Sequence, residues 1–119
     1  MTGREYIDTI SKKEIVNDKT ILVEALYNTK LPELIKRIVS SSNDNPIFLE
    51  NEIRVLSLPE IIHAESELHV DFKEKGIIPL FDCGNNDFIA YHFKEQIWSK
   101  FNIIDEVSFK KEENLNELL

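Results

Sequence analysis

The chain has 119 residues, of which 42% are hydrophobic and 30% are charged, and this composition is that of an ordinary globular protein. Its length fits one domain built around one hydrophobic core. No apolar run approaches the ~20 residues of a membrane helix, and the N-terminus lacks the apolar stretch of a signal peptide. The only cysteine, Cys83, excludes a framework of internal disulfides, so we expect a cytoplasmic protein.

The net charge of −8 is unevenly distributed along the chain. Residues 1–45 contain seven basic and seven acidic residues, whereas residues 46–119 contain seven basic and fifteen acidic residues. An acidic half repels nucleic acid, because nucleic-acid binding requires Lys and Arg to neutralise phosphates. It favours a basic partner instead, although acidic surfaces also simply keep proteins soluble. We therefore expect neither a nucleic acid nor a membrane as partner.

The first third of the chain predicts helices. Residues 1–17 show little pattern, and we expect the first dozen of them to adapt to whatever they contact. Asp18 can cap a helix that ends near residue 28. One face of this helix is formed by Leu22, Ala25 and Leu26.

A second helix follows at Pro32, which suits a first helical turn because its missing N–H costs nothing there. Its apolar stripe has the spacing i, i+3, i+4 and i+7, and consists of Leu31, Leu34, Ile35 and Ile38. The polar run 40–46 then ends the helix.

Between residues 47 and 76 the pattern changes twice. Two short apolar runs, 47–49 and 53–56, predict a hairpin. Ser57 and Glu60 then have the spacing of a capping box, which opens a helix that ends before Lys75. The residues that this helix turns inward are Leu58, Ile61, Ile62 and Leu68.

Strand-like runs follow at 77–81, 87–94 and 96–101. The first two are apolar on both faces, which is typical of strands in the middle of a sheet. Residues 107–109 can add an edge strand, and residues 112–119 a short closing helix. Helices first, then strands, with a helix between them, predict an α+β fold.

The polar run 82–87, Asp-Cys-Gly-Asn-Asn-Asp, lies between two of these strands and could bind a metal, catalyse a reaction or only connect the strands. An EF-hand register that starts at Asp82 places Gly84 and Phe93 where oxygen ligands are required, so it fails. Zinc is unsupported as well, because the single cysteine has no partner and the three histidines lack ligand spacing.

A cysteine nucleophile at Cys83 would need a base, and His92 on the following strand is the candidate. The alternative is structural, since Gly84, Asn85 and Asn86 tolerate the positive φ that tight strand connections demand. We expect a strand connection, with no catalytic residue, no cofactor and no metal.

Several motifs of the chain occur in the order that is usual in one family. They are Leu31-Pro32-Glu33, the run from Arg54 to Ile61, the run from Ile77 to Phe88, an aromatic strand around Trp98, and Ser108-Phe109. Over residues 18–119 the chain resembles the SUKH superfamily, which includes the Smi/Knr-type yeast cell-wall regulators and many bacterial immunity proteins. The glycine pair usual after the second helix is replaced here by residues 40–45.

This resemblance implies one domain, 1–119, in which helices pack alongside a mixed, mainly antiparallel sheet of about five or six strands. It also implies a non-enzymatic immunity protein that binds a cognate polymorphic toxin domain, often a basic nuclease, and blocks its active site. An acidic surface suits that role, because a nuclease must be basic to hold phosphate. The alternative is a regulatory scaffold or small-ligand-binding module of the same fold.

The candidate partner-binding surface lies in the acidic strand-and-turn half, with Trp98 as an anchor. Its candidate residues are Asp82, Asn86, Asp87, Glu95, Trp98, Asp105 and Glu106. Either a monomer or a homodimer is compatible with the sequence.

Overall fold

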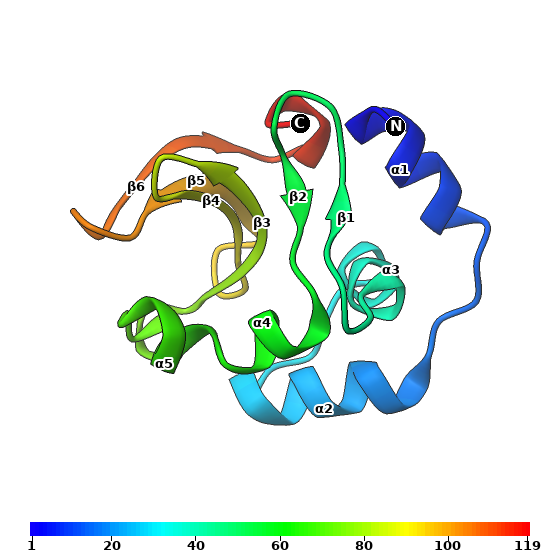
Figure 1. The fold of residues 1–119 in the computed structure, drawn as a ribbon. Coiled ribbons are helices and arrows are strands. Elements are labelled where there is room, and N and C mark those ends of the chain that lie inside the picture. The colour runs from blue at the N-terminus through cyan, green and yellow to red at the C-terminus, as the bar shows by residue number, and fades with distance from the viewer.

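The computed structural model describes residues 1–119, with helices mostly in the N-terminal half and a sheet in the C-terminal half (Figure 1). The helices are α1 (Gly3–Ser11), α2 (Asn17–Tyr27), α3 (Glu33–Ser41), α4 (Leu58–Ile62), α5 (Ala64–Leu68) and α6 (Phe72–Lys75). The strands are β1 (Ile47–Phe48), β2 (Arg54–Val55), β3 (Ile77–Gly84), β4 (Asp87–His92), β5 (Ile97–Asn102) and β6 (Val107–Glu112). The predicted α+β class is confirmed.

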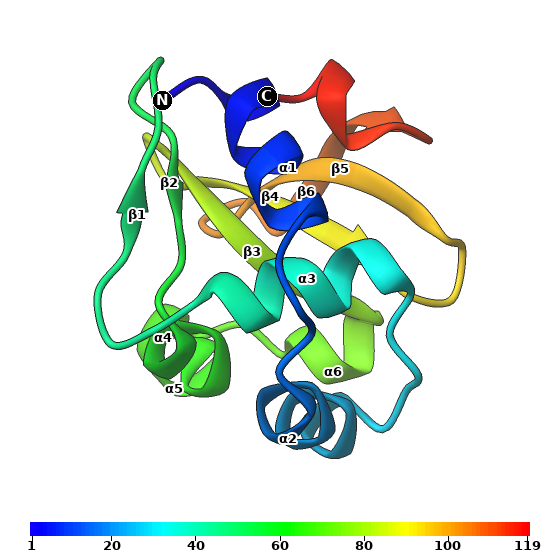
Figure 2. The ribbon, with the colours of Figure 1, turned by 90° about the vertical axis from the view of Figure 1, so that its right-hand side faces the viewer.

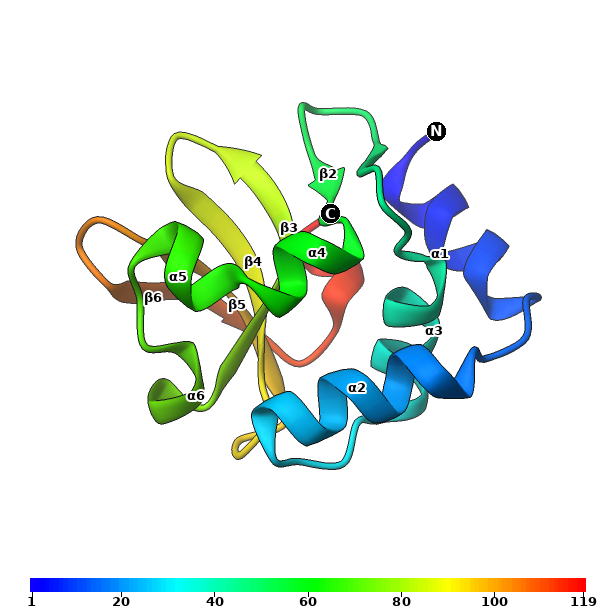
Figure 3. The ribbon, with the colours of Figure 1, turned by 60° about the horizontal axis from the view of Figure 1, so that its bottom comes forward.

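The six strands form one sheet in the order β1-β2-β3-β4-β5-β6, and every neighbouring pair is antiparallel. The sheet is therefore a meander without a parallel pair. All residues of 77–81 and 88–92 are buried, which confirms that β3 and β4 are covered on both sides. The sheet curves strongly, and helices lie on both sides of it (Figures 1 and 3).

Different helices cover the two faces of the sheet. On one face, the ring of Tyr6 from α1 meets Phe81 edge-on, with 6.1 Å between ring centroids. On the other face, Phe72 from α6 meets Phe101 with 5.9 Å between centroids. The strand register places Phe81 and Phe101 on opposite faces, because successive side chains of a strand alternate.

Helix α1 was not expected, and the prediction of an adaptable segment is wrong for residues 3–11. A capping box opens the helix: Thr2 Oγ1 accepts from the Glu5 N–H at 3.0 Å, and Glu5 Oε1 accepts from the Thr2 N–H at 3.1 Å. Tyr6 and Ile10, four residues apart, form its buried face. The helix is thus an integral part of the core.

Helix α2 ends close to where it was predicted to end, but its first residue and the side that it turns to the core differ from the prediction. Its N-cap is Val16, without a side-chain cap, and Asp18 lies inside the first turn rather than capping it. The face turned to the core consists of Thr20, Val23 and Tyr27. Of the predicted face, Leu22 and Ala25 are exposed and Leu26 is half-buried. Apolar residues therefore occur on both sides of α2.

The next two predicted helix starts agree with the structure. Pro32 is the N-cap of α3, and Leu31, Ile35 and Ile38 of its stripe are buried. The capping box of α4 is confirmed: Glu60 N–H donates to Ser57 Oγ at 3.3 Å, and Ser57 N–H donates to Glu60 Oε1 at 2.9 Å.

The single helix predicted after Ser57 is instead three short ones, α4, α5 and α6. His69 adopts a left-handed conformation, φ 56°, at the end of α5. The chain turns there, and both Val70 and Phe72 are buried. A continuous helix could not bury both, because residues two apart point to nearly opposite sides.

The C-terminal segment brings the two chain ends together. Strand β6 is longer than predicted, and the closing helix is reduced to a 3₁₀ turn, Leu115–Glu117. Gly3 lies so close to Leu119 that a Cβ on Gly3 would come within 2.7 Å of the Leu119 Cβ. Both ends lie on the same side of the molecule, opposite α2 (Figures 1 and 2). None of the helices is long and apolar enough to cross a lipid bilayer.

Candidate partner-binding surface

The polar run 82–87 connects two neighbouring strands, as predicted. Strand β3 ends at Gly84, with φ 81°, and β4 begins at Asp87. The two residues between them, Asn85 and Asn86, have φ values of 53° and 65°. Two central residues with positive φ match the twist of a tight hairpin, and asparagine adopts this conformation more readily than most residues.

The carboxylate of Asp82 is occupied by contacts within the chain. Its Oδ1 accepts from the Gly84 N–H at 2.8 Å, and its Oδ2 accepts from Arg54 Nη2 at 3.0 Å. Arg54 Nη1 also donates to Glu60 Oε1 at 2.8 Å, so these three side chains join β2, α4 and β3. No group of three or more His, Cys, Asp or Glu side chains is placed to hold a metal ion.

The fold separates Cys83 from the base that the sequence offered it. Cys83 is near the turn of the β3–β4 hairpin, whereas His92 pairs with Ile77 at the hairpin's open end. Burial raises the pKa of the Cys83 thiol to about 11, so it is protonated at neutral pH. His92 Nε2 instead lies 2.7 Å from Ser99 Oγ, and burial lowers the pKa of His92. These two residues do not form a nucleophile–base pair.

The β3–β4 turn and the β5–β6 turn lie side by side at one end of the sheet (Figures 1 and 3). Asn102 links them: its Nδ2 donates to Asp87 Oδ1 at 2.9 Å, and its Oδ1 accepts the N–H groups of Ile104 at 3.0 Å and Asp105 at 2.9 Å. The Ile103 N–H adds a bond to the Asn86 carbonyl at 3.0 Å. We call residues 84–87 together with 102–107 the paired turns. These hydrogen bonds hold them as one unit.

The paired turns present an apolar centre with acidic residues beside it. Ile104 is 70% exposed and Val107 is 53% exposed, in a molecule whose other apolar side chains are mostly buried. Asp105 and Glu106 follow Ile104 directly and are exposed. An apolar anchor with a charged rim is the usual composition of a protein–protein contact site.

The remaining predicted residues differ in where they lie. Glu95 is in the β4–β5 turn, at the opposite end of the strands, where it lies 4.0 Å from Lys111. Trp98 is only 4% exposed, because β5 lies inside the sheet and the indole packs on Tyr91 with 5.1 Å between ring centroids. Trp98 is therefore a core residue in this structure, and the prediction of an exposed anchor is corrected. The predicted residues brought together at the paired turns are Asn86, Asp87, Asp105 and Glu106, and Asp82 precedes them on β3.

Sequence reasoning missed Ile104, Val107 and Asn102. One signal could have found the first, since an isoleucine directly before Asp105 and Glu106, in a connection between strands, is unlike the polar residues usual in turns. The role of Asn102 depends on its position opposite Asp87, which only the strand register gives.

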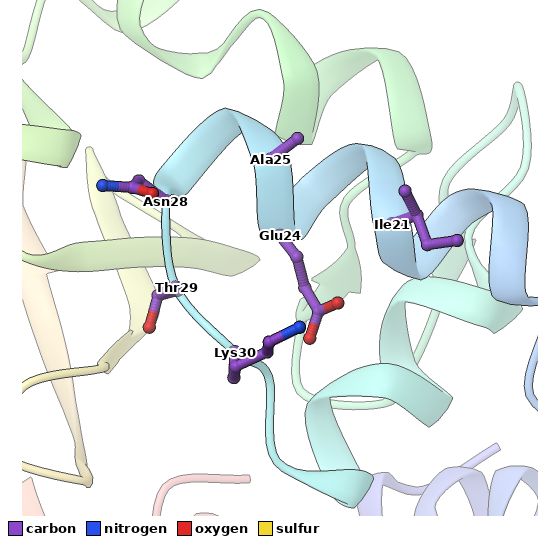
Figure 4. A pocket seen from close by; sticks show the side chains of 6 residues that line it. All are labelled: Ile21, Glu24, Ala25, Asn28, Thr29 and Lys30. Carbon is purple, nitrogen blue, oxygen red and sulfur yellow. The ribbon is translucent and has the colours of Figure 1, made fainter.

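The largest surface hollow lies elsewhere, on the outer side of α2 (Figure 4). It is lined by Ile21, Glu24, Ala25, Asn28, Thr29 and Lys30. The hollow is shallow and open, whereas sites for small molecules enclose most of the ligand's surface. It suits a protruding side chain of another protein better than a cofactor.

Neither a scan against protein-family models nor a search of the curated proteins gives a match for this chain. A role is therefore inferred from the order of its motifs and from the chemistry of its surface.

Proposed function

We propose that this chain is a SUKH-type immunity protein that binds a cognate polymorphic toxin domain in the cytoplasm and blocks its active site. The toxin domain is a basic nuclease, and the chain itself is not an enzyme. The order of the sequence motifs supports the family, and the acidic excess in residues 46–119 supports a basic partner.

The observation that carries this proposal is the geometry of the paired turns. Ile104 protrudes next to Asp105 and Glu106, and the side chain of Asn102 fixes the turn from which they extend. A surface held in its binding conformation loses little conformational entropy on association. The carboxylates can occupy the positions of substrate phosphates in a nuclease cleft, while Ile104 provides apolar contact.

A growth-rescue experiment tests the proposal. Co-expression of the chain should restore growth to cells that express the toxin domain encoded by the adjacent gene. The Ile104→Lys variant should bind that domain about 30-fold more weakly or worse, as expected for an interface anchor, and should fail to rescue growth. Affinity can be measured by titration calorimetry.

The matched control is Ile21→Lys on α2, which is the same substitution at an isoleucine of similar exposure, 62%. This variant should bind and rescue like the wild type. A chain that rescues no neighbouring toxin, or whose gene has no such neighbour, would favour the alternative of a regulatory scaffold or small-ligand-binding module.

A further inference from the structure

A small pocket lies between the sheet and the helices α4 and α5, which Figure 3 shows in front of the strands. In the strand register Arg54 is opposite Asp82, and Asp82 is opposite Phe88. Side chains of directly opposite residues point to the same face, so these three form one row across β2, β3 and β4. The residues that line the pocket are Arg54, Leu56, Glu60, Glu67, Leu68, Asp82 and Phe88.

The size and lining of this pocket suit one long side chain of another protein. Its volume is about 90 Å³, whereas sites for small molecules usually have about 300 Å³ or more. Leu56 and Phe88 are buried and give it an apolar floor, and the half-buried Leu68 adds to it. An apolar floor below a charged rim matches Lys and Arg, whose stems are apolar and whose tips are charged.

The charges of the rim favour a cation. Three carboxylates and one guanidinium line the pocket, which leaves two negative charges in excess. The two Nη atoms of Arg54 already donate to Glu60 and Asp82, so this guanidinium is neutralised within the chain. Arg54 and the Ser57 N–H both donate to Glu60 Oε1, which leaves Oε2 free. Glu67 is exposed and forms none of the ion pairs of the chain.

An exposed aromatic ring beside the pocket distinguishes arginine from lysine. Phe48 on β1 is opposite Arg54, so it continues the same row on the same face, at the edge of the sheet. It is 72% exposed, the highest value among the large apolar side chains. A guanidinium can stack flat on such a ring while its N–H groups donate to carboxylates. The compact ammonium group of lysine has no plane with which to stack.

We propose that this pocket receives one arginine side chain of a basic partner protein, with the guanidinium beside Glu67 and against the ring of Phe48. Asp82 and Phe88 flank the β3–β4 turn, so a protein seated on the paired turns can reach the pocket as well. The pocket does not depend on the immunity function, because its chemistry selects an arginine and not a particular protein.

A titration followed by nuclear magnetic resonance tests the pocket without any toxin. The probe is N-acetyl-arginine methylamide, added to the isotope-labelled full chain at constant ionic strength. The shifts should saturate with a Kd of about 1–10 mM, as expected for one side chain without a protein attached. The backbone amides that shift should be those of Phe48, Arg54, Glu67, Leu68 and Phe88.

Two related probes identify what the pocket recognises. The citrulline derivative has nearly the same shape without the charge, and it should give no saturable shift. The lysine derivative keeps the charge but lacks the plane, and it should bind at least about threefold more weakly than the arginine derivative.

Two substitutions at exposed positions test the contacts. Glu67→Gln and Phe48→Ala should each weaken binding of the arginine derivative about threefold, because one removes a charge and the other removes the ring. The matched controls, Glu113→Gln and Ile104→Ala, change exposed residues of the same kinds elsewhere and should bind like the wild type. The amide spectrum of each variant verifies that it is folded.

Any of three results would overturn the arginine pocket: shifts that do not saturate or that centre on other residues, equal binding of the citrulline or lysine derivative, or an unchanged Kd in Glu67→Gln. A chain that binds the arginine derivative as described but rescues no neighbouring toxin would retain the pocket and refute only the immunity function.

Discussion

Arg54 joins three elements that are far apart in the sequence. Its guanidinium lies 2.8 Å from Glu60 on α4 and 3.0 Å from Asp82 on β3. Partial burial alone would raise the pKa of Glu60, but the Ser57 N–H and the Arg54 guanidinium outweigh this effect and lower it from its ordinary value of 4.5. The charged form of Glu60 is therefore favoured in the folded state.

This lowered pKa predicts a pH-dependent contribution to stability. Because the folded pKa lies below the unfolded one, the contribution is complete above about pH 4.5 and disappears as the pH falls through the folded value. Glu60→Gln should cost about 1 kcal/mol at pH 7. The variant should also lose less stability than the wild type when the pH is lowered. Urea unfolding at pH 7 and at a pH below 4.5 measures the free energy of unfolding of both proteins.

The control for this measurement is Glu113→Gln, a change at an exposed glutamate. It should leave the wild-type pH dependence intact. If the free energies of unfolding of the wild type and of Glu60→Gln fell in parallel down to the lowest pH, the coupling between Arg54 and Glu60 would be absent.

For single side chains, the sequence predicts contacts between residues that are close along the chain and misses contacts between residues that are far apart along it. The capping box of Ser57 and Glu60 follows from a spacing of three residues and is confirmed. The contact between Arg54 and Asp82 spans 28 residues, so it depends on the pairing of β2 with β3. The burial of Trp98 likewise depends on which elements cover β5, and spacing alone does not show this.

Among the elements, α1 departs most from expectation. Tyr6 is almost completely buried, its ring meets Phe81, and a hydrogen bond of 2.7 Å joins its hydroxyl to Ser41 Oγ. Burial raises the pKa of Tyr6 to about 12, so the hydroxyl remains neutral. One side chain thus attaches α1 to both α3 and the sheet.

Substitutions at Tyr6 measure this attachment. Tyr6→Ala should lower the free energy of unfolding by about 3–5 kcal/mol, because it leaves a cavity between helix and sheet. Tyr6→Phe should cost only about 1 kcal/mol, the usual contribution of one hydrogen bond. Urea denaturation followed by circular dichroism gives both values.

Arg4→Ala, on the exposed side of the same helix, serves as the control and should change stability little. If Tyr6→Ala were as stable as Arg4→Ala, α1 would be an adaptable appendage after all.

Periodicity predicts an element better than it predicts the element's orientation. The stripe of α3 is apolar on one side only, and three of its four predicted residues, Leu31, Ile35 and Ile38, are buried. Leu34 is half-buried, and the buried Val39 was not predicted. Helix α2 has Val23 and Tyr27 on one side and Ile21 and Leu22 on the other, so the pattern does not determine which side faces the core.

In the whole molecule, the order of helices and strands was enough to predict the α+β class. The sheet of about five or six strands was implied by the family resemblance, and the sheet has six. The sequence did not show that the β3–β4 and β5–β6 turns share one end of the sheet while Glu95 lies at the other. That arrangement follows from the meander, which alternates turns between the two ends.

The net charge of −8 predicts how partner binding responds to salt. The dissociation constant for the proposed basic toxin domain should rise about tenfold when salt increases from about 50 to about 300 mM, mostly through slower association. The variant Asp105→Asn with Glu106→Gln should show a shallower dependence. Surface plasmon resonance at several salt concentrations measures the association and dissociation rates. An affinity unchanged by salt would contradict the electrostatic part of the proposal.

The contact between Gly3 and Leu119 has a practical consequence for such experiments. Since both chain ends leave the molecule on the side opposite α2, a tether at either terminus orients α2 towards the solution. The position of the tag, at the first residue or the last, is therefore immaterial to which face an immobilised chain displays.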